Sequence, residues 1–415
     1  MKKALSILLV LLLSLSIVGA ASSEALTGKL TIWSWDIAYA QLQRCATRFQ
    51  ATHPGVEFVF EEMGTDQIYD KLTACLATGV GLPDVVSLEG EQFPKYGANF
   101  PDAFVDFTDM LDSTKFLPIK LAEATVNGRV LAYPWDAAPV ALFYRTDVFE
   151  QAGIQAADLK TWDDLLEAGK VIKEKTGYSM LPMATSRNDI IYRIILMQLG
   201  SWYFDEAGNT RIDSPESLKA MSMVKKLYDA GITQSHGNWD EYVATISQNK
   251  VACFAEAIWM AGTIKVDAAD AAGSWRVMDL PMLDETSTGA ACNGGSLLAV
   301  PASSQSLEAA KAFVEYAMTD PVEQEDGINN GFYPSYIPSY DIPAFQQEDP
   351  FFGGQNINSV FAAIGQKIPF VNYTQNFGET ADTMKNAVAQ ILLDGKDVGE
   401  TLASTQAELV AKFGK

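Results

Sequence analysis

Hydrophobic positions near the start of the chain alternate between the period of a strand and that of a helix. Apolar residues fall every three or four positions from Ala38 to Phe49, and His53, Pro54 and Gly55 end that helical pattern. The pattern predicts, in order, a strand over 29–35, this helix, a strand over 56–63, a helix over 66–78 and a strand over 84–88. This βαβαβ order is typical of a doubly wound parallel sheet.

The rest of the chain continues to alternate helical and strand patterns. Thr161 and Asp164 form a capping box ahead of an apolar helical run. Ser214 and the proline after it predict another helix start, and Gly231 predicts its end. Residues 306–318 form a further amphipathic pattern. Because no internal repeat or long linker interrupts the pattern, we expect two lobes joined by ordinary strands.

Composition and charge exclude several functions. The chain has 415 residues, with 30 Lys and Arg against 52 Asp and Glu, so its net charge is -22. Such an acidic chain repels phosphate backbones, and nucleic-acid binding is not expected. Only His53 and His236 are present, which excludes a histidine-rich zinc site, and we expect no metal and no cofactor. No segment after the N-terminal one has 18 consecutive apolar residues.

The first 25 residues have the pattern of a cleavable signal peptide. Lys2 and Lys3 precede an uncharged apolar run over 4–18, and small residues follow at 19–20. The run is short for a membrane span, although a retained anchor is the alternative. No cysteine follows it, so a lipoprotein is not expected. The sequence therefore predicts export to the periplasm.

Four cysteines in an exported chain permit disulfides. Cys45 and Cys75 lie on the first two predicted helices, which right-handed crossovers place on opposite faces of the sheet. We therefore expect these two to be core residues. Cys253 and Cys292 remain a possible pair.

Tryptophans and carboxylates recur where predicted strands end, which is where open α/β sheets bind ligands. The residues that follow strands are Trp35, Asp36, Glu89, Glu91, Gln92, Trp135, Asp136, Trp202, Tyr203, Glu256 and Trp259. Indole and phenol rings cover the apolar face of a sugar, while carboxylates and amides bond its hydroxyls. This combination indicates a carbohydrate site.

Two other functions use similar residues. A polyamine receptor also needs aromatic faces and carboxylates, although Gln92, Asn188 and Asn293 favour a neutral ligand. A secreted glycoside hydrolase needs a carboxyl pair, and Asp136 with Glu89 or Glu256 would supply one. The scarcity of histidine and the lack of a phosphate-binding loop leave little support for other enzymes.

Several motifs in order resemble a known family. They include Lys29 to Asp36, Pro83-Asp84-Val85, Asn127-Gly128-Arg129 with Tyr133-Pro134, Phe143-Tyr144-Arg145 and Thr161 to Leu165. Together these motifs resemble the carbohydrate-binding proteins of bacterial ABC importers, of which maltose-binding protein is the best-known type. The resemblance covers nearly the whole chain after the signal peptide.

The resemblance implies two doubly wound α/β lobes joined by a hinge, with a ligand cleft between them, which is the type II fold of periplasmic binding proteins. It implies an N-terminal lobe of 26–136 and 296–345 and a C-terminal lobe of 137–295 and 346–415. It also implies a monomer that closes over a mono- or oligosaccharide and delivers it to a membrane permease.

The resemblance also adds ligand-binding candidates to the strand-end residues. These are Asn293, Gly294 and Gly295 at the return crossing, with Asn188 and Tyr333. Two departures bear on ligand size. Gly200-Ser201 stands where the family commonly has two glycines, and Leu297 stands where an aromatic residue often follows the return glycines.

Overall fold

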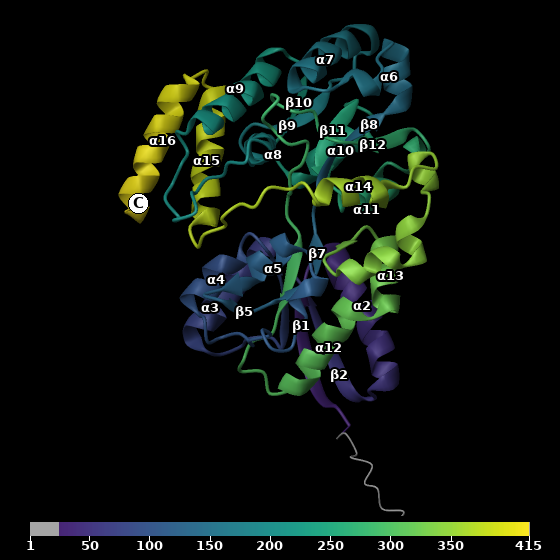
Figure 1. Ribbon diagram of the computed structural model, residues 1–415, viewed down its shortest axis with the longest axis vertical. Coiled ribbons are helices and arrows are strands. Elements are labelled where there is room, and N and C mark those ends of the chain that lie inside the picture. Colours follow the sequence, from purple (N-terminus) through teal and green to yellow (C-terminus); the bar gives the residue numbers. More distant parts are fainter. Residues whose placement is uncertain (1–24, 415) are drawn as a thin grey trace, which may run out of the picture.

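The computed structural model describes residues 25–414, which form two lobes stacked along the long axis of the molecule (Figure 1). The predicted signal peptide lies, except for Ala25, outside the described residues. Within 25–414 every helix is too short or too polar to cross a bilayer. We call the lower lobe of Figure 1 the N-lobe and the upper lobe the C-lobe.

The N-lobe is built on a five-stranded sheet of order β2-β1-β3-β13-β6. Its elements are β1 (Thr27–Ser34), α2 (Asp36–Thr52), β2 (Gly55–Glu62), α3 (Thr65–Thr78), β3 (Val85–Glu89), α4 (Phe93–Asn99), α5 (Pro118–Ala124), β4 (Thr125–Val126), β5 (Arg129–Val130), β6 (Tyr133–Pro134), β13 (Ser296–Ala299) and α12 (Leu307–Thr319). β1 pairs in parallel with β2 and β3, while β13 runs antiparallel to β3 and β6. The predicted βαβαβ unit is confirmed.

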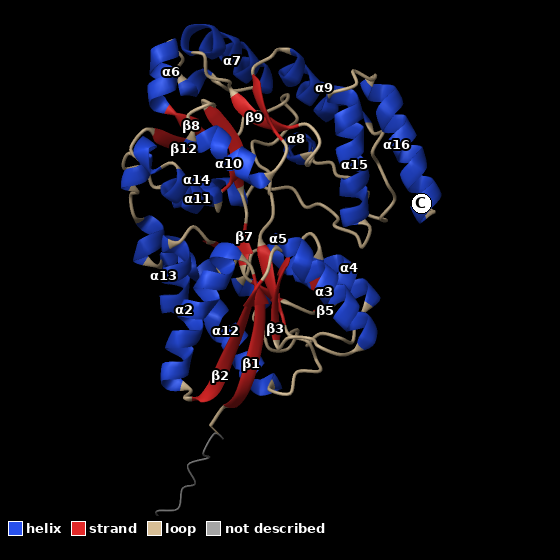
Figure 2. Cartoon of the chain, turned by 180° about the vertical axis from the view of Figure 1, so that it is seen from behind, coloured by secondary structure: helices blue, strands red, loops and turns tan. Residues whose placement is uncertain are grey.

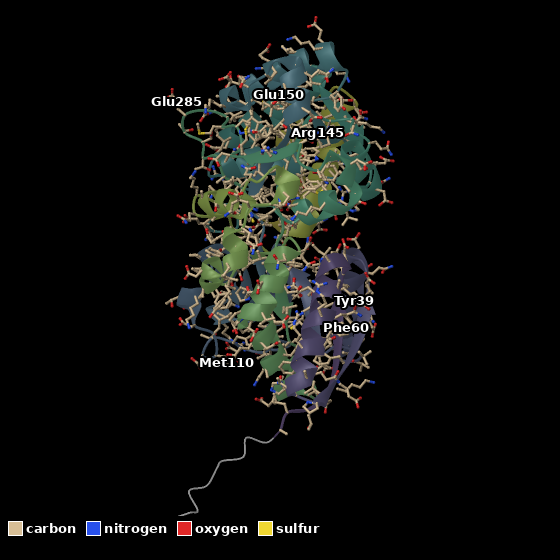
Figure 3. All side chains as sticks on the ribbon, turned by 90° about the vertical axis from the view of Figure 1, so that its right-hand side faces the viewer. Tyr39, Phe60, Met110, Arg145, Glu150 and Glu285 are labelled. Atoms are coloured by element: carbon tan, nitrogen blue, oxygen red, sulfur yellow. The ribbon has the colours of Figure 1, made fainter. Side chains whose placement is uncertain are left out.

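Helices cover both faces of the N-lobe sheet. α2 and α12 lie on one side of β1, and α3, α4 and α5 lie on the other, as the opposite views of Figures 1 and 2 agree. Cys45 is buried in the core on the α2 side, and Cys75 on α3 is partly buried. Edge-to-face packing of Tyr39 on Phe60, with ring centroids 5.8 Å apart, joins α2 to β2 (Figure 3).

The C-lobe has an antiparallel group of order β11-β8-β12 beside a parallel pair, β10 and β9. Its elements are β8 (Val140–Arg145), α6 (Thr146–Ala152), α7 (Trp162–Thr176), β9 (Leu181–Ala184), α8 (Ile190–Gln198), α9 (Pro215–Asp229), β10 (Thr233–His236), α10 (Trp239–Ser247), β11 (Cys253–Ala257), α11 (Met260–Asp267), β12 (Trp275–Met278), α14 (Ile357–Gly365), α15 (Phe377–Leu392) and α16 (Val398–Phe413). All four cysteines are free, so the possible Cys253–Cys292 pair is not formed.

Local signals in the sequence set the ends of the C-lobe helices. The Thr161 hydroxyl accepts from the Asp164 N–H at 3.1 Å and the Asp164 carboxylate accepts from the Thr161 N–H at 2.8 Å, which is the predicted capping box of α7. Ser214 caps α9 by accepting from Ser217 N–H. Gly231 follows the end of α9 with a φ of 67°, a conformation that glycine adopts without strain.

Three chain crossings join the lobes. β7 (Asp136–Ala137) leads from the N-lobe to β8, the segment before β13 returns, and β14 (Tyr333–Pro334) pairs with β7 after α13 (Pro321–Asn329). The first crossing runs through Asp136–Ala137, and the second ends where β13 begins at Ser296. Near the third crossing, Phe332 packs in the N-lobe core, whereas Ala344 and Phe345 pack in a core cluster with β8, β11 and α14.

Candidate functional site

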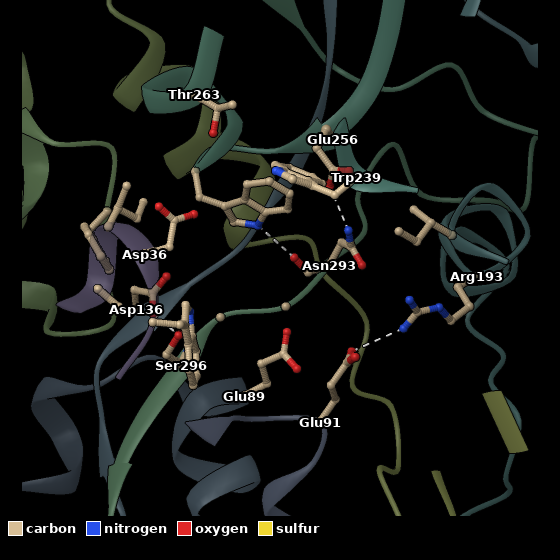
Figure 4. Close-up of a pocket in the computed structure, with 18 of the residues that line it drawn as sticks. Asp36, Glu89, Glu91, Asp136, Arg193, Trp239, Glu256, Thr263, Asn293 and Ser296 are labelled. Atoms are coloured by element: carbon tan, nitrogen blue, oxygen red, sulfur yellow. Dashed lines mark hydrogen bonds and ion pairs between the residues drawn. The ribbon is translucent and has the colours of Figure 1, made fainter. Parts of the chain in front are cut away.

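A cavity of about 300 Å³ lies between the lobes, beside the crossings. Ten of the sixteen residues named from the sequence line it: Trp35, Asp36, Glu89, Glu91, Asp136, Glu256, Trp259, Asn293, Gly294 and Gly295. Figure 4 shows that the N-lobe carboxylates and the C-lobe side chains face one another across this space. Residues far apart in the sequence therefore meet in one concave site of the kind that binds small molecules.

The N-lobe wall comes from the carboxyl ends of β1 and β3. Trp35 and Asp36 follow β1, and Glu89 ends β3. Asp36 begins α2 with a φ of 44°, in the left-handed region that non-glycine residues rarely occupy. The Tyr69 hydroxyl donates to Glu89 at 2.5 Å. Burial and the nearby Glu91 carboxylate raise the pKa of Glu89 to about 7.

The C-lobe wall comes from β11 and the starts of α10 and α11. Buried Glu256 ends a hydrogen-bonded chain: Asn293 donates to it at 2.7 Å, and the Ala257 N–H donates at 2.9 Å. Burial raises the pKa of Glu256 against the effect of these donors. The Trp259 indole N–H donates to the Asn293 carbonyl at 3.1 Å, which fixes its ring at the cavity wall.

The crossing strands form the cavity floor. Buried Asp136 accepts from the Ser296 N–H at 2.8 Å, which ties the outward crossing to the return crossing. Burial raises the pKa of Asp136, and the Lys120 ammonium counteracts that rise. Gly294 and Gly295 have φ values of 87° and 93°, so glycine is required for the chain to turn here.

Sequence reasoning missed the two cavity cations and one tryptophan. Arg193 on α8 forms ion pairs of 3.2 Å with Glu91 across the cleft and with Asp189 on its own lobe. The Arg187 guanidinium lies over the Trp239 ring at 5.6 Å, and Trp239 lies 5.8 Å from Trp259 between ring centroids. Trp239 is the first residue of α10, directly after the N-cap Asn238. The helix-start signal at Asn238 is the feature of the sequence that could have pointed to Trp239.

Smaller groups complete the lining. Thr263 on α11 and Ser296 at the end of the return crossing also line the cavity (Figure 4). Ile37, Ala38, Ile190 and Phe332 supply apolar surface. Together with the tryptophans, these residues give the cavity an apolar surface beside its charged groups.

Two predicted residues lie outside the cavity because neighbouring residues on an extended segment face opposite ways. Trp135 precedes the lining Asp136, so its ring points into the N-lobe core and stacks on Phe332 at 5.1 Å. Tyr333 follows the lining Phe332 and is buried in the core cluster with β8, β11 and α14, where its ring centroid lies 5.5 Å from that of Tyr340.

The other four predicted residues do not line the cavity, because they contact other parts of the chain. Trp202 and Tyr203 are buried in the C-lobe core, where both rings stack on Phe377 of α15. Asn188 accepts from the Ile190 N–H at the start of α8 and lines a small separate pocket. The Gln92 side chain points toward Gly378 at the start of α15.

Within the part of the chain that the structure describes, no three His, Cys, Asp or Glu side chains are arranged to hold a metal ion. The acidic loop of 205–210 is a hairpin turn, in which the Asp205 N–H donates to the Asn209 carbonyl at 2.9 Å. Asp205 also accepts from the Asn209 side chain.

The fold and the cleft define a class: two α/β lobes, linked by crossing strands, that present residues from both sides to a cavity between them. The chain belongs to the family of bacterial extracellular solute-binding proteins, whose model matches residues 44–352. This assignment agrees with the family resemblance of the sequence motifs.

Individual proteins support the family and the fold. The chain is 31% identical over 402 residues to a lactose-binding protein of Rhizobium radiobacter, covering 94% of each. It is 28% identical over 338 residues to an arabinooligosaccharide-binding protein of Halalkalibacterium halodurans, covering 77% of this chain and 74% of the relative. Among solved structures, the GacH receptor of Streptomyces glaucescens matches with a TM-score of 0.82 at 21% identity, over 93% of this chain and 98% of that one.

Proposed function

We propose that this protein is a periplasmic receptor that captures a neutral saccharide in the cavity between its lobes and delivers it to the permease of an ABC importer. One observation carries the proposal: Trp35 of the N-lobe and Trp239 and Trp259 of the C-lobe line the same cavity as carboxylates of both lobes. The names of the relatives, which bind lactose and arabinooligosaccharides, support it.

The lining suits the chemistry of a sugar. Indole faces cover C–H surfaces of a pyranose ring, and ionised carboxylates accept strong hydrogen bonds from hydroxyls. Asn293 and the two arginines add donors for ring and hydroxyl oxygens. The volume of about 300 Å³ is at the small end of ligand sites, which favours a mono- or disaccharide.

Closure of the lobes would couple binding to transport. Because each wall of the cavity belongs to a different lobe, a ligand that touches both binds the closed form better and shifts the population toward it. The proposed ligand contacts are the ten lining residues predicted from the sequence together with Arg187, Arg193 and Trp239. In this proposal the exported chain acts as a monomer, without nucleic acid and without turnover of the sugar.

Two alternative functions, a polyamine receptor and a glycoside hydrolase, would use residues of the same cavity. A polyamine would be attracted by the lining carboxylates and opposed by Arg187, while Arg193 is already paired with Glu91 and Asp189. A glycoside hydrolase would use Glu256 or Asp136 as an acid, yet the curated relatives named above are binding proteins.

Calorimetry against lactose, maltose, arabinobiose, mannitol and spermidine tests the proposal. We expect one neutral sugar or polyol to bind with a free energy of about -8 kcal/mol, corresponding to a micromolar Kd, and chromogenic glycosides to remain intact. Binding of spermidine alone, weakened strongly by salt, would establish the polyamine receptor. Hydrolysis of a glycoside that Glu256→Gln abolishes would establish the enzyme.

A further inference from the structure

A buried tyrosine lies behind the C-lobe wall of the cavity without lining it. Tyr242 is on α10, three residues after Trp239, and only 5% of its surface is exposed. Its ring packs against the ring of Trp239, with centroids 5.6 Å apart, and against that of His236 at 4.9 Å. These ring contacts fix the direction of the phenol and therefore the position of its hydroxyl.

The hydroxyl of Tyr242 bonds the buried carboxylate of the cavity wall. It donates to Oε2 of Glu256 at 3.3 Å. The other oxygen, Oε1, accepts from the Asn293 side-chain amide at 2.7 Å and from the Ala257 N–H at 2.9 Å. Among the described residues, Tyr242 supplies the one hydrogen bond that Oε2 accepts. A buried acceptor that loses its donor is costly, so the orientation of this carboxylate depends on the tyrosine hydroxyl.

The bond from Asn293 to Glu256 continues toward the aromatic surface of the cavity (Figure 4). Asn293 comes directly before two glycines that have positive φ values, so its side chain anchors a segment whose next residues are conformationally permissive. Its backbone carbonyl accepts from the Trp259 indole N–H at 3.1 Å. Tyr242, Glu256, Asn293 and Trp259 therefore form one continuous chain of hydrogen bonds that ends at a cavity-lining ring.

Tyr242 thus reaches the two tryptophans of the C-lobe wall by different routes. It touches Trp239 directly, ring against ring, and it reaches Trp259 only through the chain of hydrogen bonds. Phenylalanine at position 242 would keep the ring contact and remove the hydrogen bond. The two routes can therefore be separated by deleting a single oxygen atom.

We propose that Tyr242 is a positioning residue of the binding site: by holding Glu256 against Asn293, its hydroxyl fixes the Trp259 ring in the orientation that stacks on a saccharide. The inference rests on the proposed function for its ligand. Its physical basis is preorganisation, because an aromatic face that is already held in place needs less ordering when the ligand binds.

The test variant is Tyr242→Phe, and Tyr192→Phe is its matched control. Tyr192 on α8 is 1% exposed, and its hydroxyl bonds that of Ser217 on α9 at 2.7 Å. Neither Tyr192 nor Ser217 lines the cavity. Each variant therefore loses one buried phenol hydroxyl from a C-lobe helix. All measurements are made at pH 8, so that the ionisation of Glu89 is not a variable.

The first measurement needs no ligand. In nuclear magnetic resonance spectra, the Trp259 indole N–H signal is identified by its loss in Trp259→Phe. We expect Tyr242→Phe to move this signal upfield and to speed its exchange with water about tenfold, roughly the effect of losing one net hydrogen bond. The buried Trp162 indole, which donates to Gln198 at 2.9 Å, should keep its signal and its exchange rate.

The control variant should leave both indole signals as in wild type. A Trp259 signal that Tyr242→Phe does not move would overturn the proposal. An equal acceleration of exchange at Trp162 would also overturn it, because that result marks a general loosening of the C-lobe.

The second measurement is lactose binding by calorimetry. We expect Tyr242→Phe to bind about five- to tenfold more weakly than wild type, again the size of one net hydrogen bond, while Tyr192→Phe binds as wild type does. In an Asn293→Ala background the chain is already broken, so adding Tyr242→Phe should weaken binding by less than about twofold. An equal loss in both backgrounds, or full affinity in Tyr242→Phe, would contradict the proposed route.

The two measurements separate this inference from the proposed function. If wild type does not bind lactose while the Trp259 indole responds as stated, the choice of ligand fails and the hold of Tyr242 on Trp259 stands. If wild type binds lactose while the indole does not respond, the inference fails and the proposed function stands.

Discussion

Glu91 of the N-lobe and Arg193 of the C-lobe form an ion pair across the cleft, with 3.2 Å between carboxylate oxygen and guanidinium nitrogen. Both side chains are largely buried, with exposures of 13% and 12%. Such a pair is screened little by salt, and it joins the two lobes directly. Because Arg193 also pairs with Asp189 at 3.2 Å, its charge stays compensated when Glu91 is neutralised.

We therefore expect Glu91→Gln to open the ligand-free protein while leaving it folded. Small-angle X-ray scattering should give a larger radius of gyration for the ligand-free variant than for wild type, with the two values converging once saccharide is bound. Arg193→Met should behave differently, because it leaves two nearly buried carboxylates unpaired and should cost about 3–5 kcal/mol of stability. Glu61→Gln, which removes a more exposed ion pair with Lys71, is the control. Unchanged scattering from Glu91→Gln would show that the pair does not hold the lobes.

The ring of Trp239 is expected to stack on the ligand together with Trp259. Trp239→Ala should weaken saccharide binding at least tenfold, since it removes both an aromatic face and the surface on which the Arg187 guanidinium rests. Trp239→Phe keeps an aromatic face and should retain most of the affinity. Calorimetry measures both variants, and an alanine variant that binds as tightly as wild type would remove Trp239 from the site.

The strand ends could be predicted from the sequence because parallel strands bring their carboxyl ends to one edge of a sheet. That rule located Trp35, Asp36 and Glu89 from local patterns alone. The rule does not tell which of two neighbouring side chains faces the cleft, so it predicts both Trp135 and Asp136, although only Asp136 lines the cavity.

Long-range packing decides the remaining positions. Trp202 is covered by Phe377, a residue of α15 that lies 175 positions further along the chain, and no local pattern reports that contact. Arg193 likewise gains its role only when the lobes bring it to Glu91. The helices, their caps and the N-lobe βαβαβ unit depend on short-range patterns and were predictable, whereas the antiparallel pairing of β8 with β11 and β12 was not.

Glu89 should make the stability of the ligand-free protein depend on pH. Its pKa is raised from 4.5 to about 7 in the folded state, so the stability that the neutral carboxyl contributes is fully present below pH 4.5 and is lost as the pH rises through 7. Glu89→Gln keeps a neutral acceptor for the Tyr69 hydroxyl. The Tm of the variant should lie closest to that of wild type at pH 5 and exceed it at pH 8, by about 1 °C for each kcal/mol.

Differential scanning calorimetry at pH 5, 6, 7 and 8 measures this gap. Glu285→Gln, on an exposed loop of the C-lobe, should melt with wild type at each pH. If the Tm of Glu89→Gln runs parallel to that of wild type from pH 5 to pH 8, Glu89 does not titrate in this range.

Asp36 combines a cavity-lining carboxylate with a left-handed backbone, at a φ of 44°. A non-glycine residue in that region costs about 1–2 kcal/mol, and such strain commonly persists where function requires the side chain. Asp36→Gly should therefore stabilise the ligand-free protein by about 1 kcal/mol, partly offset by the loss of an acidic residue in the first turn of α2. The same change should weaken saccharide binding, because a hydroxyl loses its acceptor. Asp36→Asn, which tolerates the same backbone, should lose affinity without that gain in stability. Urea unfolding and calorimetry on the two variants separate the effects, and a glycine variant less stable than wild type would show that Asp36 is not strained.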